Sequence, residues 1–259
     1  MIYALLLLLS AFPLSAQVIF SRRIYQETGR THQQLWNWNP ADNTLRQLSD
    51  SPRDHLDPSC SGSGIHFVSP SESPLKDNLW NFDRAGSKET LLGPLPPDAN
   101  DKTRTLPGCD VSAVRGPLYA CARRGELSIT RGGVELGRLA PGTSDLPIEA
   151  LSWSPTGKWL LVGTLGVNTN STSPQSDLFV VEVPAMKLVK AASGNAAAWL
   201  PSRDRFFYTT PREMANLPGA RRPRGVWVEQ LMLFDPQTGK SAAITSGLTN
   251  NVQPVVCGK

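Results

Sequence analysis

Residues that bind metals or activate nucleophiles are scarce in this chain, which has four cysteines and three histidines among 259 residues. No C-x-x-C pair is present, so the ligand spacing of a zinc site is missing. The G-x-S-x-G elbow of serine hydrolases and the G-x-x-x-x-G-K loop that holds phosphates are also absent. With 26 basic and 22 acidic residues, the net charge of +4 does not by itself imply a nucleic-acid partner. These absences favour a protein that is not an enzyme and that needs no metal or cofactor.

Long apolar runs are absent after the first sixteen residues, so the sequence predicts no membrane span in the mature protein. The first sixteen residues are typical of a secretory signal peptide. Leu5–Leu9 is apolar, Pro13 interrupts the run, and Ala16 is a small residue before the predicted cut. We therefore expect residues 1–16 to be removed and residues 17–259 to form a single exported domain, periplasmic or secreted.

Glycine and proline, with 21 and 22 residues, interrupt the chain too often for long helices. One strand-length pattern that opens with a polar residue and leucine recurs five times, and its starts are separated by 44, 48, 51 and 53 residues. Turn residues follow most copies, so each unit is predicted to contain a β-hairpin. The five copies are residues 34–39, 78–83, 126–131, 177–182 and 230–235.

A second pattern precedes each hairpin. Its clearest copy, residues 151–162, contains a short strand that ends near Trp153, a Ser-Pro-Thr-Gly turn and an apolar strand. Related copies contain Ala198, Cys60 and Cys109. Tryptophans recur in these patterns, and we expect them to pack one unit against the next rather than to bind sugars. They are Trp36, Trp80, Trp153 and Trp199.

The fifth copy of the second pattern is split between the two ends of the chain. Residues 253–259 form the strand that enters a turn, and residues 17–21 form the strand that leaves one. Ends that complete one unit close a ring and remove exposed sheet edges. We therefore predict an all-β fold, a β-propeller of five blades with four antiparallel strands each, closed by the N- and C-terminal strands in one blade. Six blades would need another unit, and the longest gaps, 167–176 and 211–225, are predicted to be loops.

The turn and the strands around it resemble a known repeat. Ser154-Pro155-Thr156-Gly157-Lys158, followed by an apolar strand, resembles the Ser-Pro-Asp-Gly-Lys signature of TolB-type propeller repeats. The strand at 230–235, its Asp-Pro-Gln-Thr-Gly turn and the pair Ile244-Thr245 are similar to the same repeat. The resemblance covers nearly all of the mature chain and concerns the repeat rather than the whole of TolB. It implies a propeller of the bacterial cell envelope, often one that serves as a protein-binding platform.

The four cysteines are an even number in a chain that we expect to be exported, which is a disulfide signal. Four cysteines allow three pairings. Cys109 and Cys121 flank one predicted turn on antiparallel neighbours. Cys60 and Cys257 fall near the same end of innermost strands in adjacent blades. The favoured pairing is therefore Cys109 with Cys121 and Cys60 with Cys257.

Three acidic residues, Asp57, Asp110 and Glu149, fall just before or within predicted innermost strands. Paired carboxylates at the central channel would suit glycoside hydrolysis, so a carbohydrate-active propeller, glycoside-hydrolysing or sugar-binding, is the alternative function. The neighbouring Asp54-His55-x-Asp57 is interpreted as a loop between blades whose side chains bond to local backbone. A metal site there would need further ligands, which the sequence does not indicate.

The remaining candidate is a basic insertion between Pro211 and Gly225. Loops on rigid scaffolds commonly carry binding, and clustered guanidinium groups suit an acidic partner or a phosphate. The first hypothesis is therefore an exported, non-catalytic propeller that binds another envelope protein or a peptide, and not nucleic acid, through its loops or funnel. The arginines of the insertion are Arg212, Arg221, Arg222 and Arg224.

Overall fold

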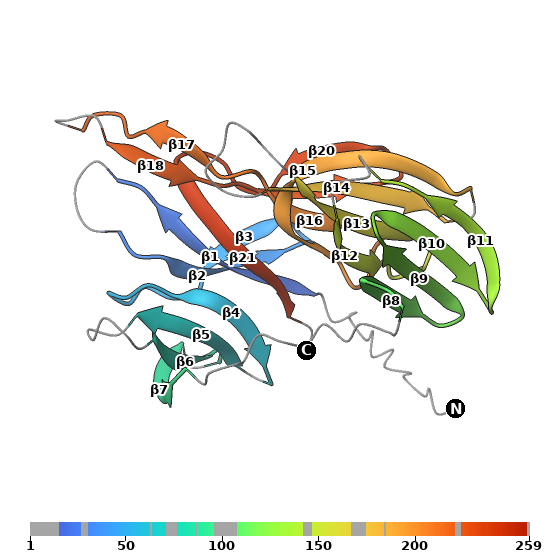
Figure 1. Cartoon of the computed structure of the whole chain (residues 1–259). Helices are drawn as coiled ribbons and strands as arrows, with labels where there is room; N and C mark the ends of the chain where they lie inside the picture. Colours follow the sequence, from blue (N-terminus) through green and yellow to red (C-terminus); the bar gives the residue numbers. More distant parts are fainter. Residues whose placement is uncertain are drawn as a thin grey trace, which may run out of the picture.

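The regular elements in the described part of the chain are all β-strands (Figure 1). The computed structural model describes residues 16–26, 31–62, 64–70, 77–85, 87–95, 108–141, 147–166, 175–183, 185–220 and 224–257. No helix that could cross a membrane is found in these ranges. The prediction of an all-β fold is confirmed.

Three sheets of the described chain have four antiparallel strands each. The first contains, in spatial order, β21 (Thr249–Cys257), β1 (Gln17–Ile24), β2 (Gln34–Asn39) and β3 (Thr44–Gln47). The second contains β4 (Leu56–Ser61), β5 (Gly64–Pro70), β6 (Asp77–Asp83) and β7 (Lys88–Pro94). The third contains β8 (Val111–Arg115), β9 (Leu118–Arg123), β10 (Glu126–Arg131) and β11 (Val134–Leu139).

A further sheet has seven strands, and one of them changes partner along its length. Its order is β12 (Ile148–Trp153), β13 (Trp159–Gly166), β14 (Gln175–Glu182), β15 (Lys187–Trp199), β16 (Phe206–Thr209), β19 (Leu231–Asp235) and β20 (Lys240–Ala243). The first part of β15 pairs with β14 as far as Gly194, and the remainder pairs with β16 from Asn195. A Cβ on Gly194 would lie 2.1 Å from the carbonyl oxygen of Thr209, so only glycine allows this approach. β15 thus completes one four-stranded arrangement and begins the next.

The prediction of a loop between Pro211 and Gly225 is wrong, because a hairpin begins inside it. β17 (Glu213–Asn216) pairs with β18 (Gly225–Val228), and the amide of Leu217 donates to the carbonyl of Arg224 at 3.0 Å. Burial of Leu217 and Val226 accounts for the order of the hairpin, which the many prolines and arginines conceal in the sequence. The hairpin lies at one end of the molecule, at the upper left of Figure 1. The other predicted loop, 167–176, falls outside the described residues except for the first two residues of β14.

The two ends of the chain pair with each other, as predicted. β1 runs antiparallel to β21, with Gln17 opposite Cys257, Val18 opposite Val256 and Ile19 opposite Val255. The ladder continues to Ile24 opposite Thr249, with one bulge on the way. Residues that are more than 200 positions apart therefore share a sheet.

Four buried apolar clusters hold the sheets together, and each cluster joins two neighbours. Side chains alternate between the two faces of β1, so Phe20 packs with Leu231 of β19 whereas Ile19 packs with Phe67 of β5. The first cluster joins β9–β10 to β12–β14, and the second joins β13–β14 to β16 and β19. The third cluster joins β16 and β19 to β1–β2, and the fourth joins β1–β2 to β5–β6. The sheets at the ends of this series, β4–β7 and β8–β11, lie apart in Figure 1, and no buried cluster of the described residues joins them.

Two of the recurring tryptophans connect neighbouring units by the same contact. The indole N–H of Trp153 donates to the carbonyl of Ala113 on β8 at 3.0 Å, and that of Trp199 donates to the carbonyl of Ser152 on β12 at 2.8 Å. Both rings belong to buried clusters, so their predicted packing role is confirmed. An indole offers a large apolar surface and one directional donor, which aligns as well as stabilises the contact.

Both predicted disulfides are present. Cys60 of β4 is bonded to Cys257 of β21 across a sequence separation of 197, and Cys109 is bonded to Cys121 across a separation of 12. The described chain has no free cysteine. The longer bond links the second sheet to the terminal strand of the first.

The Cys60–Cys257 bond is expected to stabilise the fold more than the Cys109–Cys121 bond, because it closes a much longer loop in the unfolded chain. Replacing Cys60 and Cys257 by serine should lower the free energy of unfolding by about 4–5 kcal/mol, against about 3 kcal/mol for the matched Cys109→Ser, Cys121→Ser variant. Urea denaturation measures both values. A smaller loss for the Cys60, Cys257 pair would contradict the argument.

Candidate functional site

The three predicted channel acids have separate surroundings. The amide of Asp57 donates to the side-chain oxygen of Gln253 at 2.9 Å, and the side-chain amide of Gln253 donates back to the Asp57 carboxylate. Burial raises the pKa of Asp57, with a smaller contribution from the charge of Asp77. Asp110 instead accepts a 2.7 Å hydrogen bond from the amide of Arg124. The carboxylates of Asp57 and Asp110 are therefore each occupied within the scaffold.

Glu149, the third acid, lines a small cavity of about 220 Å³. The cavity lies among β12, β13, β14 and β15, and Asn195 and Ala196 are also in its wall. Ala196 has a positive φ of 50°, as do Asp57 at 46° and Gln253 at 54°. Among the described residues, no hydrogen bond or ion pair joins one of the three acids to another. The glycoside-hydrolysis hypothesis therefore remains a prediction without geometric support.

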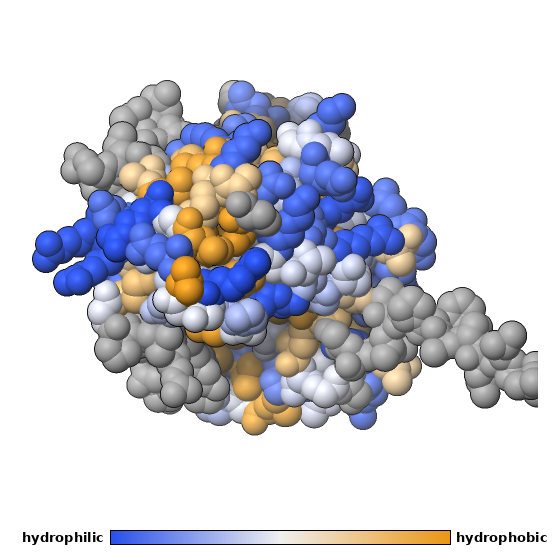
Figure 2. All heavy atoms as spheres, turned by 90° about the vertical axis from the view of Figure 1, so that its right-hand side faces the viewer, coloured by the Kyte–Doolittle hydropathy of each residue, from blue (hydrophilic) through white to orange (hydrophobic). Residues whose placement is uncertain are grey.

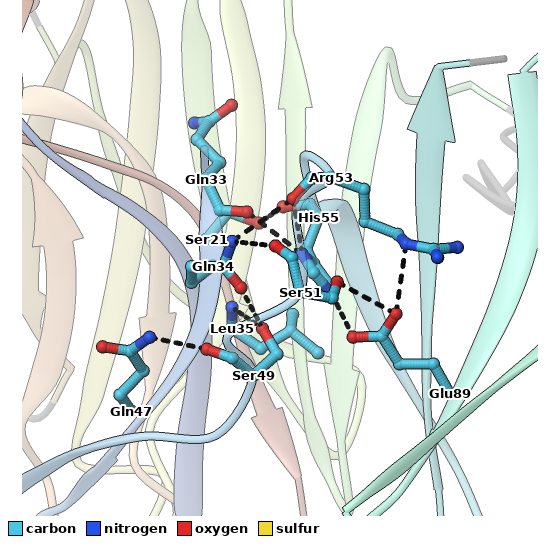
Figure 3. A network of polar contacts seen from close by, with 10 residues as sticks. All are labelled: Ser21, Gln33, Gln34, Leu35, Gln47, Ser49, Ser51, Arg53, His55 and Glu89. Atoms are coloured by element: carbon cyan, nitrogen blue, oxygen red, sulfur yellow. Dashed lines mark hydrogen bonds and ion pairs between the residues drawn. The ribbon is translucent and has the colours of Figure 1, made fainter. Parts of the chain in front are cut away.

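A buried polar network that sequence reasoning did not identify lies between the first two sheets (Figure 3). His55 is fully buried. Its Nδ1 lies 3.1 Å from the carbonyl oxygen of Gln33, and its Nε2 lies 2.8 Å from the carboxylate of Glu89. The hydroxyl of Ser21 donates to the backbone carbonyl of His55 and not to its ring. The serine, histidine and glutamate therefore do not form a nucleophilic triad, which needs a serine bonded to the imidazole.

Glu89 also receives contacts from the segment just before His55. Arg53 pairs with the Glu89 carboxylate at 3.3 Å and lies over the ring of Trp80 at 3.9 Å. The hydroxyl of Ser51 donates to the same carboxylate at 3.1 Å. The network attaches the chain between the first two sheets to β7, so its role is structural.

The same arrangement recurs where the last strands meet, with asparagine in place of histidine. The amide of His55 donates to the carbonyl of Gln33 at 2.9 Å, and the amide of Asn251 donates to that of Glu229 at 3.1 Å. The side chain of Asn251, which is fully buried, also donates to the Glu229 carbonyl. The two copies also share a hydroxyl contact. In the first copy, the Ser49 hydroxyl accepts from the Leu35 amide at 2.9 Å. Thr245 accepts from the Leu231 amide at 2.8 Å.

The sequence carried a signal for this network in two repeated dipeptides. Gln34-Leu35 recurs as Gln230-Leu231, and Leu48-Ser49 recurs as Ile244-Thr245. Gln34 accepts from the Ser49 hydroxyl at 2.8 Å, as Gln230 does from the Thr245 hydroxyl at 3.0 Å. The aligned pairs therefore mark a shared hydrogen-bond pattern. The sequence interpretation has Asp54 and His55 bonding to local backbone. The His55 ring does lie 3.2 Å from the Arg53 carbonyl, but the Asp54 carboxylate accepts from the amide of Gln33, 21 residues away, at 2.6 Å.

The asparagine in the second copy provides a test of the His55 contacts. His55→Asn keeps a donor for the Gln33 carbonyl and loses the Glu89 contact, whereas His55→Leu loses both. We expect the free energy of unfolding to fall by about 1 kcal/mol in the first variant and about 2–3 kcal/mol in the second, because unpaired buried polar groups are costly. Urea denaturation of both proteins measures the difference. Equal losses would show that the backbone contact contributes nothing.

The predicted arginine cluster is partly within the described chain. Arg212 and Arg224 flank the hairpin, whereas Arg221 and Arg222 lie outside the described residues. The guanidinium of Arg212 lies 4.6 Å from the ring centre of Trp227 on β18. The phenol of Tyr25, just after β1, lies near the backbone of Trp227, which acts to lower its pKa. Arg212, Arg224, Tyr25 and Trp227, together with Arg23, are called the arginine–aromatic cluster below.

Burial raises the pKa of Tyr25 above its ordinary value of 10.0, although Arg23, Arg212 and Arg224 oppose the rise. The phenol is therefore neutral near pH 7 and remains a hydrogen-bond donor. Arg23 pairs with Asp54 at 2.8 Å. Neither Arg212 nor Arg224 forms an ion pair within the described part of the chain. The cluster thus has unpaired positive charge, which suits an anionic ligand.

Beside the cluster, Glu229 is a buried carboxyl. Burial raises its pKa above the ordinary value of 4.5, and the charge of Arg212 lowers part of this rise. A raised pKa means that folding favours the protonated form. The contribution of protonated Glu229 to the free energy of unfolding is fully present below pH 4.5 and is lost as the pH rises through the folded-state pKa.

Glu229→Gln should therefore gain stability relative to the wild type as the pH rises from 4 to 7. The uncharged amide has no carboxylate to desolvate at neutral pH. Chemical denaturation across this range measures the difference, and Glu213→Gln on the exposed strand β17 is the matched control. A difference between Glu229→Gln and wild type that does not vary with pH would contradict the assignment.

A different exposed surface lies on the β11 side. Val134 and Leu136 of this edge strand are 68% and 37% exposed. Figure 2 views this side and shows hydrophobic side chains gathered among hydrophilic ones. A bulge interrupts β11 near Leu136, and Glu135 pairs with Arg138 at 3.0 Å. Bulges and charges on an edge strand protect it against pairing with another strand, so these features do not indicate a docking edge.

Comparisons with known proteins find similar structures but no matching family. No family model matches the sequence, and no curated protein matches it. One similar structure is the β-propeller domain of the trilobed protease from Pyrococcus furiosus, with 10% identity and a TM-score of 0.34 over 74% of this chain and 57% of that chain. The tricorn protease has 12% identity and a TM-score of 0.28, covering 89% of this chain and 30% of that one. A TolB candidate from Agrobacterium tumefaciens has 15% identity and a TM-score of 0.32, covering 89% of each chain. The chain thus spans 57% of the length of the trilobed protease domain and 30% of the length of the tricorn protease.

Proposed function

We propose that this chain is an exported, non-catalytic β-propeller that binds a protein or peptide of the bacterial cell envelope. Counting the two parts of β15 separately, its strands make five four-stranded antiparallel units, which supports five blades. The pairing of β1 with β21 supports closure of one blade by the two ends of the chain. Two disulfides are compatible with an oxidising compartment outside the cytoplasm.

The hairpin β17–β18 is the observation that carries the binding role. It interrupts one unit between β16 and β19, and within the described chain it pairs with no other sheet. Its exposed side chains include Met214, which is 63% exposed. Its flanks carry Arg212 and Arg224, which have no ion pair in the described residues. An irregular projection on a rigid, repetitive scaffold is where binding residues usually lie.

Site-specific photocrosslinking tests this proposal in cells that export the chain with its own leader. A photoreactive residue at Met214 is expected to give a discrete crosslinked product in the periplasmic fraction. The same residue at Val134, which is 68% exposed on β11, serves as the control and should give none. Products of equal intensity at the two positions, or none at Met214, would count against a binding hairpin. Retention of the chain in the cytoplasm would refute export.

A further inference from the structure

The arginine–aromatic cluster combines groups from distant parts of the sequence along the hairpin. Arg212 lies at the base of the hairpin, and Arg224 lies opposite Leu217 at its turn end. Arg23 comes from β1, Tyr25 follows the same strand, and the amide of Tyr25 donates to the carbonyl of Leu248 at 3.1 Å. The backbone of Trp227 on β18 lies near the Tyr25 phenol and acts to lower its pKa. β18 also contacts β21, the strand that pairs with β1, and this contact places the hairpin next to the end of β1. The charges of Arg23, Arg212 and Arg224 all act on the phenol of Tyr25, with that of Arg224 the weakest.

The cations of this cluster exceed the anions that face them. Arg23 is neutralised by Asp54 at 2.8 Å. The carboxyl of Glu229 is buried near Arg212, and its desolvation opposes ionisation. Arg224 is exposed and has no ion pair in the described residues. A ligand that brings negative charge would therefore meet uncompensated guanidinium groups.

The position of Arg212 is fixed by stacking. Its guanidinium lies 4.6 Å from the ring centre of Trp227, and its Nε is buried without a hydrogen-bond partner. A stacked guanidinium keeps its planar edge free to donate two parallel hydrogen bonds, the arrangement that a carboxylate accepts. Because the ring holds the group in place, binding costs less side-chain entropy than it would for a free arginine.

The structure also favours an extended peptide over a single small anion. Arg23 is paired with Asp54, and Arg212 and Arg224 lie at opposite ends of the hairpin, so one small anion does not account for both unpaired guanidinium groups. β17 pairs only with β18 in the described part of the chain, which leaves its outer edge of backbone amides and carbonyls unpaired by any strand. An extended peptide adds to such an edge through main-chain hydrogen bonds. Met214 on this strand offers an exposed apolar contact.

We propose that the partner segment is an acidic peptide whose aspartate or glutamate carboxylates bind Arg212 and Arg224 while its backbone lies along β17. This assignment rests on the proposed function, since it names the chemistry of the segment that the hairpin binds. Arg212 and Arg224 supply the charge, Trp227 positions Arg212, and the neutral Tyr25 hydroxyl supplies a further donor.

Fluorescence anisotropy with the mature, oxidised protein tests the assignment. The probe is a labelled ten-residue peptide of five Glu-Thr repeats, and its control is the peptide of five Gln-Thr repeats. We expect at least tenfold weaker binding of the Gln-Thr peptide. Arg212→Ala with Arg224→Ala should weaken Glu-Thr binding at least tenfold, whereas Arg46→Ala with Lys240→Ala, which removes two charges from exposed edge strands, should change it less than twofold. Arg212→Lys keeps the charge but not the planar fork, so an intermediate loss is expected.

Three outcomes would overturn the acidic-peptide assignment. One is equal binding of the two peptides, and another is unchanged binding after Arg212→Ala with Arg224→Ala. The third is displacement of the labelled peptide by inorganic phosphate at the same concentration as the peptide, which would indicate a site for a small anion. The thermal midpoints of the variants confirm that they are folded. If crosslinking at Met214 persists under any of these outcomes, the hairpin binds a partner that is not acidic, and only the chemistry proposed here is refuted.

Discussion

The antiparallel pairing of β1 with β21 is the contact on which the rest of the molecule depends. β1 lies in the middle of its sheet and sends alternate side chains to two different sheets, Phe20 to one and Ile19 to the other. It therefore belongs to two of the four buried clusters. Since the hydrophobic effect has no direction, burial alone does not select which strands meet. The backbone ladder between the chain ends sets this register, and the Cys60–Cys257 bond keeps the ends together.

Directional polar contacts determine how the neighbouring units are aligned. The indoles of Trp153 and Trp199 donate to carbonyls of the adjacent unit, while His55 and Asn251 bond to the backbone from fully buried positions. Each of these groups would be costly to bury without a partner. An alternative packing of the sheets would leave them unpaired, so the repeated polar positions disfavour shifted arrangements. The repeat thus carries alignment as well as hydrophobic surface.

The regular sheets also support the irregular hairpin β17–β18. Holding like charges close together costs free energy, as does desolvating a carboxyl such as Glu229, and a marginal structure would relax to avoid both. Here the hairpin is attached to strands that disulfides and buried clusters already hold, so Arg212 remains stacked on Trp227 without a counter-ion in the described chain. Excess charge at the surface of a rigid frame is what a binding surface for an anionic partner needs.

The sequence by itself determined the strand content, the spacing of the units, the pairing of the chain ends and both disulfides. These features follow from local patterns, because side-chain alternation, turn residues and recurring tryptophans report on each strand separately. Only the tertiary structure decided the surroundings of the acids and arginines. Asp57 and Asp110 appeared equivalent to Glu149 in the sequence, yet the first two are bonded to Gln253 and Arg124 while Glu149 faces a cavity. The hairpin was hidden for the same reason, because its order depends on burial of Leu217 and Val226 in the folded protein, which leaves no local pattern in the sequence.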